Sequence, residues 1–107
     1  TAIRDFIHVY DIAEIHLKVL EKIDKWNVSK ILNGGYDKGT SVLEVAKEFI
    51  KHSSRKVKLF KTNRRKKDIV KIIASNNNLK KLIKCNPRYN SLGTIVKSCL
   101  SWEKKIK

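Results

Sequence analysis

The sequence is poor in cysteine, and this shortage limits the metal chemistry available to the chain. Cys85 and Cys99 are the only cysteines among its 107 residues, and two thiolates need histidines at ligand spacing to complete a four-coordinate zinc site. His8, His16 and His52 do not offer such spacing. Both cysteines fall in apolar helical patterns, so we expect no metal site and two buried thiols in a reducing compartment.

Long apolar runs and leader sequences are also missing. No stretch approaches the roughly 20 apolar residues that span a bilayer, and no charged and then apolar leader opens the chain. We therefore expect a cytoplasmic protein without a membrane segment. The sequence contains no nucleophile elbow, no Gly-x-Gly-x-x-Gly loop and no Gly/Ser-rich linker. These absences exclude common catalytic motifs and favour a single domain over residues 1–107.

Acidic residues are scarce relative to basic ones. Ten acidic residues oppose 25 basic ones, which gives a net charge of +15 and a pI near 10.0. Such a charge is typical of proteins that bind nucleic acid or anionic surfaces. However, the basic residues are spread along the chain, and most of them are lysines, whereas a nucleic-acid footprint clusters on one face. We expect diffuse surface charge, with a small basic nucleic-acid-binding module as the alternative.

The N-terminal segment predicts a short strand followed at once by a helix. Residues 6–10 are mostly β-branched or aromatic, which is typical of a buried strand. Apolar residues then recur at helical spacing over 12–23, and Asp11 and Glu14 have the spacing of a capping box. The pattern therefore assigns Asp11 the role of a helix N-cap.

Two further strands and a second helix are expected in the middle of the chain. Residues 30–33 and 56–60 have short strand patterns. Between them, Gly34–Gly35 marks a place where the backbone turns sharply or approaches another element closely. Ser41 and Glu44 form a second capping box ahead of an apolar stripe at helical spacing. A helix is therefore predicted to start at this box.

The C-terminal third predicts two more helices. Residues 76–78 are asparagines that can cap a short helix, and Pro87 prevents this helix from continuing. Ser91 can cap a last helix over 92–106, in which apolar residues again recur on one side. Taken together, the patterns predict an α+β chain of about four helices with three short strands.

Two stretches resemble one enzyme family. Arg4–Glu14, with its Arg-Asp pair and the following Ile-His-Val, resembles the segment that opens the last third of UDP-galactose 4-epimerases. These are NAD-dependent nucleotide-sugar enzymes of the extended short-chain dehydrogenase/reductase type. Asn33, Gly35, Gly39 and Ser41-Val42 match the strand end, glycine loop and helix start of the same family. The resemblance implies that the chain is the C-terminal, substrate-binding part of such an enzyme.

The resemblance also implies particular ligand residues. Arg4 matches the arginine of the family's Arg-Asp motif, and Arg65 matches the second arginine of its Arg-Arg-x-x-Asp motif; both contact the substrate diphosphate there. Asp68 matches the aspartate that accepts hydrogen bonds from the ribose hydroxyls. Ile72 falls where many members carry a tyrosine that lines the sugar pocket. The sequence departs from the motif at 66–67, where lysines replace an acidic or proline residue and then glycine. Taken alone, this basic run is typical of a solvated loop.

The catalytic apparatus of the family is expected outside this sequence. Its Tyr-x-x-x-Lys pair and its dinucleotide loop lie upstream of the matching segment, and neither motif occurs here. The resemblance therefore implies that NAD is bound by a missing N-terminal Rossmann domain and that the chain alone is catalytically silent. We expect a UDP-sugar as the partner, rather than a membrane or nucleic acid. Without the sheet of that Rossmann domain, apolar surface of this chain would be uncovered. Self-association or strand exchange is therefore also expected.

Overall fold

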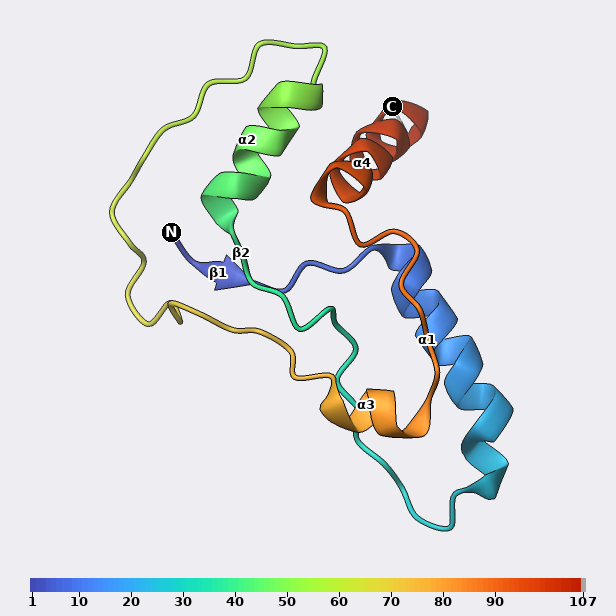
Figure 1. The fold of residues 1–107 in the computed structure, drawn as a ribbon. Helices are drawn as coiled ribbons and strands as arrows, with labels where there is room; N and C mark the ends of the chain where they lie inside the picture. Colours follow the sequence, from blue (N-terminus) through green and yellow to red (C-terminus); the bar gives the residue numbers. More distant parts are fainter. Residues whose placement is uncertain (107) are drawn as a thin grey trace.

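The computed structural model describes residues 1–106, and in this range it has four α-helices and one two-stranded sheet (Figure 1). The α+β class with four helices that the sequence predicts is confirmed. The molecule is elongated, with extents of 52 × 35 × 21 Å. In chain order the elements are β1 (Ile3–Arg4), α1 (Val9–Lys22), the 3-10 turn η1 (Ile23–Lys25), β2 (Thr40–Ser41), α2 (Val42–His52), α3 (Asn77–Leu82) and α4 (Leu92–Ile106).

The helices are arranged in two pairs on either side of the small sheet. Helices α2 and α4 pack against each other at one end of the molecule (Figure 1). At the other end α3 lies beside α1, where Lys22 Nζ donates a hydrogen bond to the Leu82 carbonyl at 3.2 Å. A long irregular connection leads from the end of α2 to the start of α3. The sheet therefore lies where the two pairs and this connection meet.

Three chain segments join at Ile3. Strands β1 and β2 are antiparallel, with Ile3 opposite Ser41. On its other side Ile3 forms an isolated parallel bridge with Lys71, in which the Ile3 N–H donates to the Val70 carbonyl at 2.8 Å and the Ile72 N–H donates to the Ile3 carbonyl at 2.9 Å. The last part of the irregular connection is thereby held beside β1.

The three strands predicted from the sequence are not found at their expected positions. Within residues 1–106, the ranges 30–33 and 56–60 contain no strand, and the range 6–10 ends in the first residues of α1. A strand is stable only when a neighbour pairs with its backbone N–H and C=O groups. Several apolar side chains of these segments are exposed to solvent, with Ile31 92% and Phe60 79% exposed. Their apolar character therefore does not reflect pairing within this chain.

The N-cap of α1 also differs from the sequence prediction. His8 occupies this position, and its Nδ1 accepts a hydrogen bond from the Tyr10 N–H at 3.0 Å. Asp11 lies inside the first turn of the helix. The second predicted capping box is confirmed, because the Ser41 hydroxyl accepts from the Glu44 N–H and the Glu44 carboxylate accepts from the Ser41 N–H.

Asp11 is a buried acceptor for three donors from distant parts of the chain. Its carboxylate accepts a hydrogen bond from the Tyr36 hydroxyl and others from the backbone N–H groups of Arg88 and Tyr89, at 3.0 and 3.1 Å. The Tyr36 hydroxyl in turn accepts from the His8 N–H at 3.1 Å. These bonds tie the loops before β2 and before α4 to the start of α1. The buried carboxylate is therefore a structural junction of the fold.

The pKa values of this pair follow from burial and from the shared hydrogen bond. Burial acts to raise the pKa of Asp11, but the bonds from Tyr36, Arg88 and Tyr89 and the nearby His8 outweigh it, so the pKa lies below its ordinary value of 3.8. Burial and the bond to the Asp11 carboxylate raise the pKa of Tyr36 to about 12. Asp11 is therefore charged, and Tyr36 protonated, throughout the neutral range.

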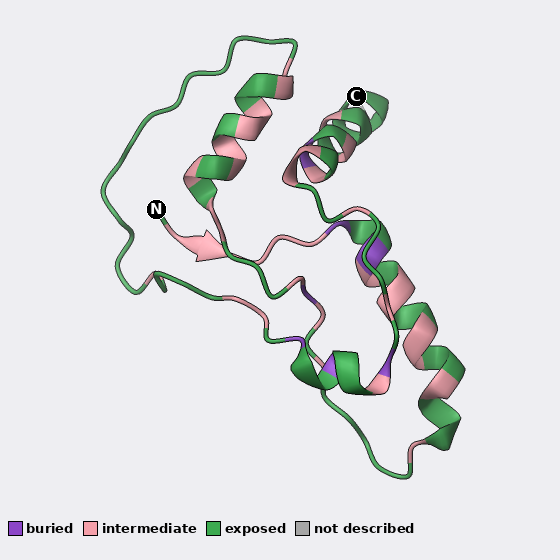
Figure 2. Cartoon of the chain, viewed as in Figure 1, coloured by how far each residue is buried: buried purple, intermediate pink, exposed green. Residues whose placement is uncertain are grey.

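The buried interior is small and half polar. Three apolar side chains, three polar side chains and one glycine are buried among the described residues, and they appear as short purple segments in Figure 2. Because burial of apolar area is the main stabilising contribution to folding, so small an apolar core makes the buried hydrogen bonds important for stability. The buried residues are Leu79, Ile83, Val96, His8, Asp11, Asn76 and Gly35.

Gly35 lies at a close approach between three segments, which is one of the two alternatives that the sequence leaves open for the Gly34–Gly35 pair. A Cβ atom at this position would lie 2.7 Å from the Ala74 Cβ and 2.7 Å from the Asp5 Oδ2. The Asp5 carboxylate is held in place because it accepts hydrogen bonds from the Tyr36 and Asp37 N–H groups at 3.1 and 2.9 Å. There is therefore no room for a side chain.

We expect Gly35→Ala to lower the free energy of unfolding by about 1–3 kcal/mol, because the added methyl group must displace packed atoms. Urea-induced unfolding followed by circular dichroism measures this change. Gly93→Ala is the matched control, since a Cβ at this position in α4 would lie no closer than 3.7 Å to its neighbours. The control should be neutral or slightly stabilising. Equal destabilisation by both variants would contradict this packing argument.

Asp11→Asn should lower the free energy of unfolding by about 2 kcal/mol at pH 7, because a charged acceptor of three hydrogen bonds is lost. A folded-state pKa below 3.8 means that Asp11 stabilises the fold fully above that pH, and that this stabilisation is lost as the pH falls through the folded-state value. Urea titrations between pH 7 and pH 2 should therefore show the wild-type and variant curves converging on acidification. Asp24→Asn, at an exposed position of η1, is the control, and a gap that stays constant with pH would contradict the assignment.

Candidate functional site

Arg4 on β1 reaches across to the irregular connection. Its Nη2 lies 3.1 Å from the Asp68 Oδ1, and the two side chains are 28% and 27% exposed. The Nη1 of the same guanidinium donates to the Ile3 carbonyl at 2.8 Å. The ion pair joins residues that are 64 positions apart in sequence. It is formed because the bridge at Ile3 places the two segments side by side.

A hollow of about 570 Å³ adjoins this pair, and we call it the arginine hollow. It is lined by residues of β1, the start of α2 and the segment 59–68. Arg4, Arg65 and Asp68, which the sequence resemblance singles out, all line it. Its other lining residues are Thr1, Ala2, Val42, Leu43, Ala46, Leu59, Phe60, Lys61, Thr62, Asn63 and Arg64.

The lining of the arginine hollow is strongly cationic. Arg4, Lys61, Arg64 and Arg65 contribute four positive charges against the single carboxylate of Asp68. Guanidinium groups are permanently charged and can each donate two parallel hydrogen bonds to a carboxylate or phosphate. The hollow is therefore chemically suited to an anion with several oxygen atoms.

Helix α2 does not offer its N-terminal N–H groups to such an anion. The Val42 N–H donates to the Ala2 carbonyl at 2.9 Å, and the Leu43 N–H to the Thr1 Oγ1 at 3.3 Å. The capping box occupies the N–H groups of Ser41 and Glu44. A helix N-terminus attracts anions mainly through free N–H groups. Anion binding in this hollow would therefore depend on the basic side chains.

Ile72 lies outside this lining. Its backbone N–H is engaged with Ile3, and its side chain is 47% exposed. The structure thus brings three of the four residues suggested by the resemblance around one hollow and places Ile72 beside it. The isoleucine side chain has no hydrogen-bonding group. It therefore cannot take over the polar role of a tyrosine hydroxyl at this position.

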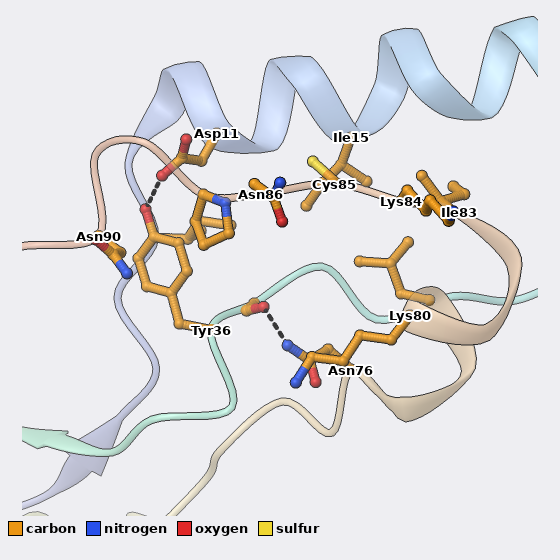
Figure 3. Close-up of a pocket in the computed structure, with 14 residues that line it drawn as sticks. Asp11, Ile15, Tyr36, Asn76, Lys80, Ile83, Lys84, Cys85, Asn86 and Asn90 are labelled. Carbon is orange, nitrogen blue, oxygen red and sulfur yellow. Dashed lines mark hydrogen bonds between the residues drawn. The ribbon is translucent and has the colours of Figure 1, made fainter.

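A second hollow, which the sequence analysis did not anticipate, lies between α1 and α3, and we call it the α1–α3 hollow. Its volume is about 450 Å³, and the Asp11–Tyr36 bond crosses one end of it (Figure 3). The residues of that bond are 25 positions apart in sequence. No local sequence motif therefore predicts this hydrogen bond. The lining residues are Ile7, Asp11, Ile15, Gly35, Tyr36, Asn76, Leu79, Lys80, Ile83, Lys84, Cys85, Asn86, Pro87 and Asn90.

The two cysteines are in different environments. Cys85 is partly buried in the wall of the α1–α3 hollow, and burial together with the nearby carboxylates of Glu14 and Asp11 raises the pKa of its thiol. Cys99 on α4 is exposed, so the expectation that both thiols are buried was wrong for this residue. An amphipathic helix at the surface leaves one side open when it has a single neighbour, and α4 packs mainly on α2.

The described part of the chain offers neither a metal site nor a membrane-spanning helix. Within residues 1–106, no three or more His, Cys, Asp or Glu side chains are grouped as ligands for a metal ion. In the same range, every helix is too short or too polar to cross a bilayer. The functional candidates that remain are thus the two hollows and the apolar surface.

Comparison with known sequences relates the chain to one group of enzymes. No family model matches it. The UDP-glucose 4-epimerase of Azospirillum brasilense is 33% identical over 106 residues, which cover 99% of this chain and 30% of that enzyme. The chain thus spans about a third of the length of the curated relatives that it matches, and the match lies in their C-terminal part.

Solved structures give the same relation. The UDP-Glc/GlcNAc 4-epimerase of Campylobacter jejuni superposes with a TM-score of 0.83 and 39% identity, over 98% of this chain and 32% of that one. The UDP-glucose-4-epimerase of Stenotrophomonas maltophila, with bound NAD and formylated UDP-arabinopyranose, superposes with a TM-score of 0.89 and 27% identity, over 99% of this chain and 31% of that one. In sequence and in fold, the chain matches the C-terminal part of UDP-glucose 4-epimerases.

Proposed function

We propose that the chain serves as the substrate-binding C-terminal part of a UDP-glucose 4-epimerase-like enzyme and holds the diphosphate of a UDP-sugar in the arginine hollow. The observation that carries this proposal is that Arg4, Arg65 and Asp68 line one hollow although they come from distant parts of the chain. The related Stenotrophomonas enzyme binds a UDP-sugar, which supports the same class of ligand here.

The contacts of Arg4 and Asp68 suggest which part of the ligand each of them binds. The ion pair uses the Asp68 Oδ1 and the Arg4 Nη2, which leaves the Asp68 Oδ2 to accept from the ribose hydroxyls. Arg65 and the remaining N–H groups of Arg4 then donate to the diphosphate. Because the pair preorients Arg4, less side-chain entropy is lost on binding. Val42, Leu43 and Ala46 of α2 line the apolar side of the same hollow.

The chain's own residues do not fit a dinucleotide site, and we propose that NAD is held elsewhere in the enzyme. The glycines of a dinucleotide loop leave space that a bound diphosphate approaches. At Gly35 this space is taken by Ala74 and Asp5, and at Gly34 it is taken by Ile12 and Ile15. In this proposal the chain binds and orients the nucleotide part of the substrate, and it supplies no catalytic residue.

The exposed apolar surface is consistent with an enzyme in which another part of the protein holds NAD. Helix α1 and the segment after it carry a group of exposed apolar side chains, although such residues are normally buried in soluble proteins. We propose that the N-terminal nucleotide-binding part of the enzyme covers them, and that they drive self-association when it is missing. These residues are Leu17, Leu20, Ile23, Val28 and Ile31.

The turn that presents Arg65 and Asp68 contains a residue in an unfavourable conformation. The Asp68 N–H donates to the Arg65 carbonyl at 3.3 Å, and Lys67 between them has a φ of 66°. This left-handed region costs a residue with a side chain about 1–2 kcal/mol. The family that the sequence resembles usually has glycine at this position. The backbone conformation is thus kept here despite the replacement of glycine by lysine.

Lys67→Gly should raise the free energy of unfolding by about 1 kcal/mol, since glycine adopts a positive φ without steric strain. Thermal and urea unfolding measure this change. Lys66→Gly removes the same charge at a neighbouring residue without a positive φ, and it should be neutral or slightly destabilising. If Lys66→Gly stabilised the chain as much as Lys67→Gly, the gain would come from charge removal and not from the turn.

Calorimetric titration with UDP at low ionic strength tests the proposed function. We expect saturable binding that Arg65→Gln weakens by about tenfold or more, because a charge-assisted bidentate contact is lost. Arg55→Gln is the matched control: it removes one positive charge at an exposed residue outside the hollow, and it should leave the affinity nearly unchanged. Equal losses in both variants would indicate a response to net charge only.

The same titration with duplex DNA over a salt series tests the alternative function, a small basic nucleic-acid-binding module. A nucleic-acid-binding protein should show affinity that falls steeply with salt, together with no response to UDP. That combination would contradict the proposed function. Saturable UDP binding that depends on Arg65 would exclude the alternative.

A further inference from the structure

The α1–α3 hollow has features of a ligand site that the proposed function does not use. It shares no lining residue with the arginine hollow. Part of its lining is apolar: Ile7 and Ile15 contribute from the N-terminal segment and α1, and Leu79 and Ile83 contribute from α3 and the residue after it. Ligand pockets typically combine such a wall with a few fixed polar groups. The polar groups of this hollow therefore decide what it can bind.

Asn76 presents one buried hydrogen-bond acceptor without a partner. The residue is 6% exposed and lines the hollow, and its Oδ1 has no hydrogen-bond partner in the described structure. Its Nδ2 donates to the Gly35 carbonyl at 3.0 Å, which fixes the orientation of the amide (Figure 3). Most buried polar atoms in folded proteins are paired. An N–H or O–H donor of a ligand in the hollow would satisfy this oxygen.

The other buried polar groups at the hollow are already engaged. Both oxygens of the Asp11 carboxylate accept hydrogen bonds from protein groups, and the Tyr36 hydroxyl donates to Asp11 and accepts from the His8 N–H. These groups form a rigid wall and do not compete with Asn76 for a ligand donor. Among the buried side-chain polar atoms of the described residues, the Asn76 Oδ1 is the one left without a hydrogen-bond partner.

The charged groups around the hollow favour an anion on the α3 side. Lys80 and Lys84 line the hollow with exposed side chains. Lys80 lies in α3, and Asn76 is the N-cap residue of the same helix. The carboxylates of Asp11 and Glu14 lie toward α1, near Cys85. The hollow therefore has an apolar middle, a buried acceptor, and cations at its α3 rim.

We propose that the α1–α3 hollow binds a small apolar carboxylate that carries one N–H or O–H donor. The apolar body lies between Ile15 and Ile83, the donor bonds to the Asn76 Oδ1, and the carboxylate pairs with Lys80 and Lys84. The volume of about 450 Å³ accommodates a bicyclic aromatic ring with a short acid side chain. The small side chain of Cys85 keeps this space open.

Indole-3-acetate is a suitable probe because it combines an apolar ring, one N–H and one carboxylate. We expect saturable binding to the full chain by calorimetry. The analogue 1-methylindole-3-acetate lacks the donor and should bind about tenfold more weakly, since the Asn76 oxygen stays unpaired. The analogue 3-methylindole lacks the carboxylate and should also bind more weakly. Equal affinity for indole-3-acetate and its N-methyl analogue, or no saturation at millimolar concentration, would overturn the proposal.

Variants locate the binding within the chain. Cys85→Trp should fill the hollow and abolish binding of indole-3-acetate, whereas Cys99→Trp at the exposed position on α4 should leave it unchanged. Lys80→Gln should weaken binding about threefold to tenfold, and Lys81→Gln, on the same helix but outside this lining, should not. Retained binding in Cys85→Trp, or equal effects of the two lysine variants, would place the probe elsewhere and overturn the proposal.

Thiol labelling gives a readout that does not depend on the folding of Cys85→Trp. In a Cys99→Ser background, indole-3-acetate should slow alkylation of Cys85 at least threefold, whereas UDP should not. Unchanged alkylation at saturating probe would overturn the proposal. Failure here leaves the UDP titration unaffected, because the two hollows share no residue. The two proposals can therefore fail independently.

Discussion

The buried carboxylate of Asp11 is the interaction on which the arrangement of the fold depends. It sits in the first turn of α1 and accepts hydrogen bonds from Tyr36, Arg88 and Tyr89. A buried charge is costly unless it is fully hydrogen-bonded, so these donors cannot move away independently. Because the apolar core is small, this network does much of what a larger core does in other proteins: it holds the loops before β2 and α4 against α1.

A second constraint, the backbone junction at Ile3, creates the arginine hollow. Ile3 is bonded to β2 on one side and to the segment around Lys71 on the other. Arg4 follows directly and therefore meets Asp68 across the junction. The cationic lining is thus built on short backbone pairings rather than on a helix N-terminus, whose N–H groups are already engaged. Positioning through the backbone is well suited to a ligand-binding group, since it limits side-chain motion.

The chain leaves many large apolar side chains exposed to solvent. Small chains bury a limited share of their surface, and α1 presents exposed Leu17 and Leu20 while Ile31 is almost fully exposed. The related enzymes are about three times as long as this chain. The apolar pattern over 30–33, which predicts a buried strand, is what a sheet built with the remainder of such an enzyme would require. The segment therefore carries a pattern that its own chain does not use.

The sequence by itself determined the features that depend on neighbouring residues: the four helices, the Ser41–Glu44 capping box and, through its motifs, the resemblance to 4-epimerases. Local spacing is sufficient for these because helix hydrogen bonds and caps span only a few residues.

Only the tertiary structure decided the rest. It assigned Asp11 to a buried junction instead of a cap, left 30–33 and 56–60 unpaired, and brought Arg4 beside Asp68. It also left the buried Oδ1 of Asn76, a residue that lines a hollow, without a hydrogen-bond partner. Each of these outcomes depends on groups from 25 to 78 positions apart, or on whether a pairing strand is present at all. Such long-range pairings are absent from local sequence patterns because they form only when the segments pack together.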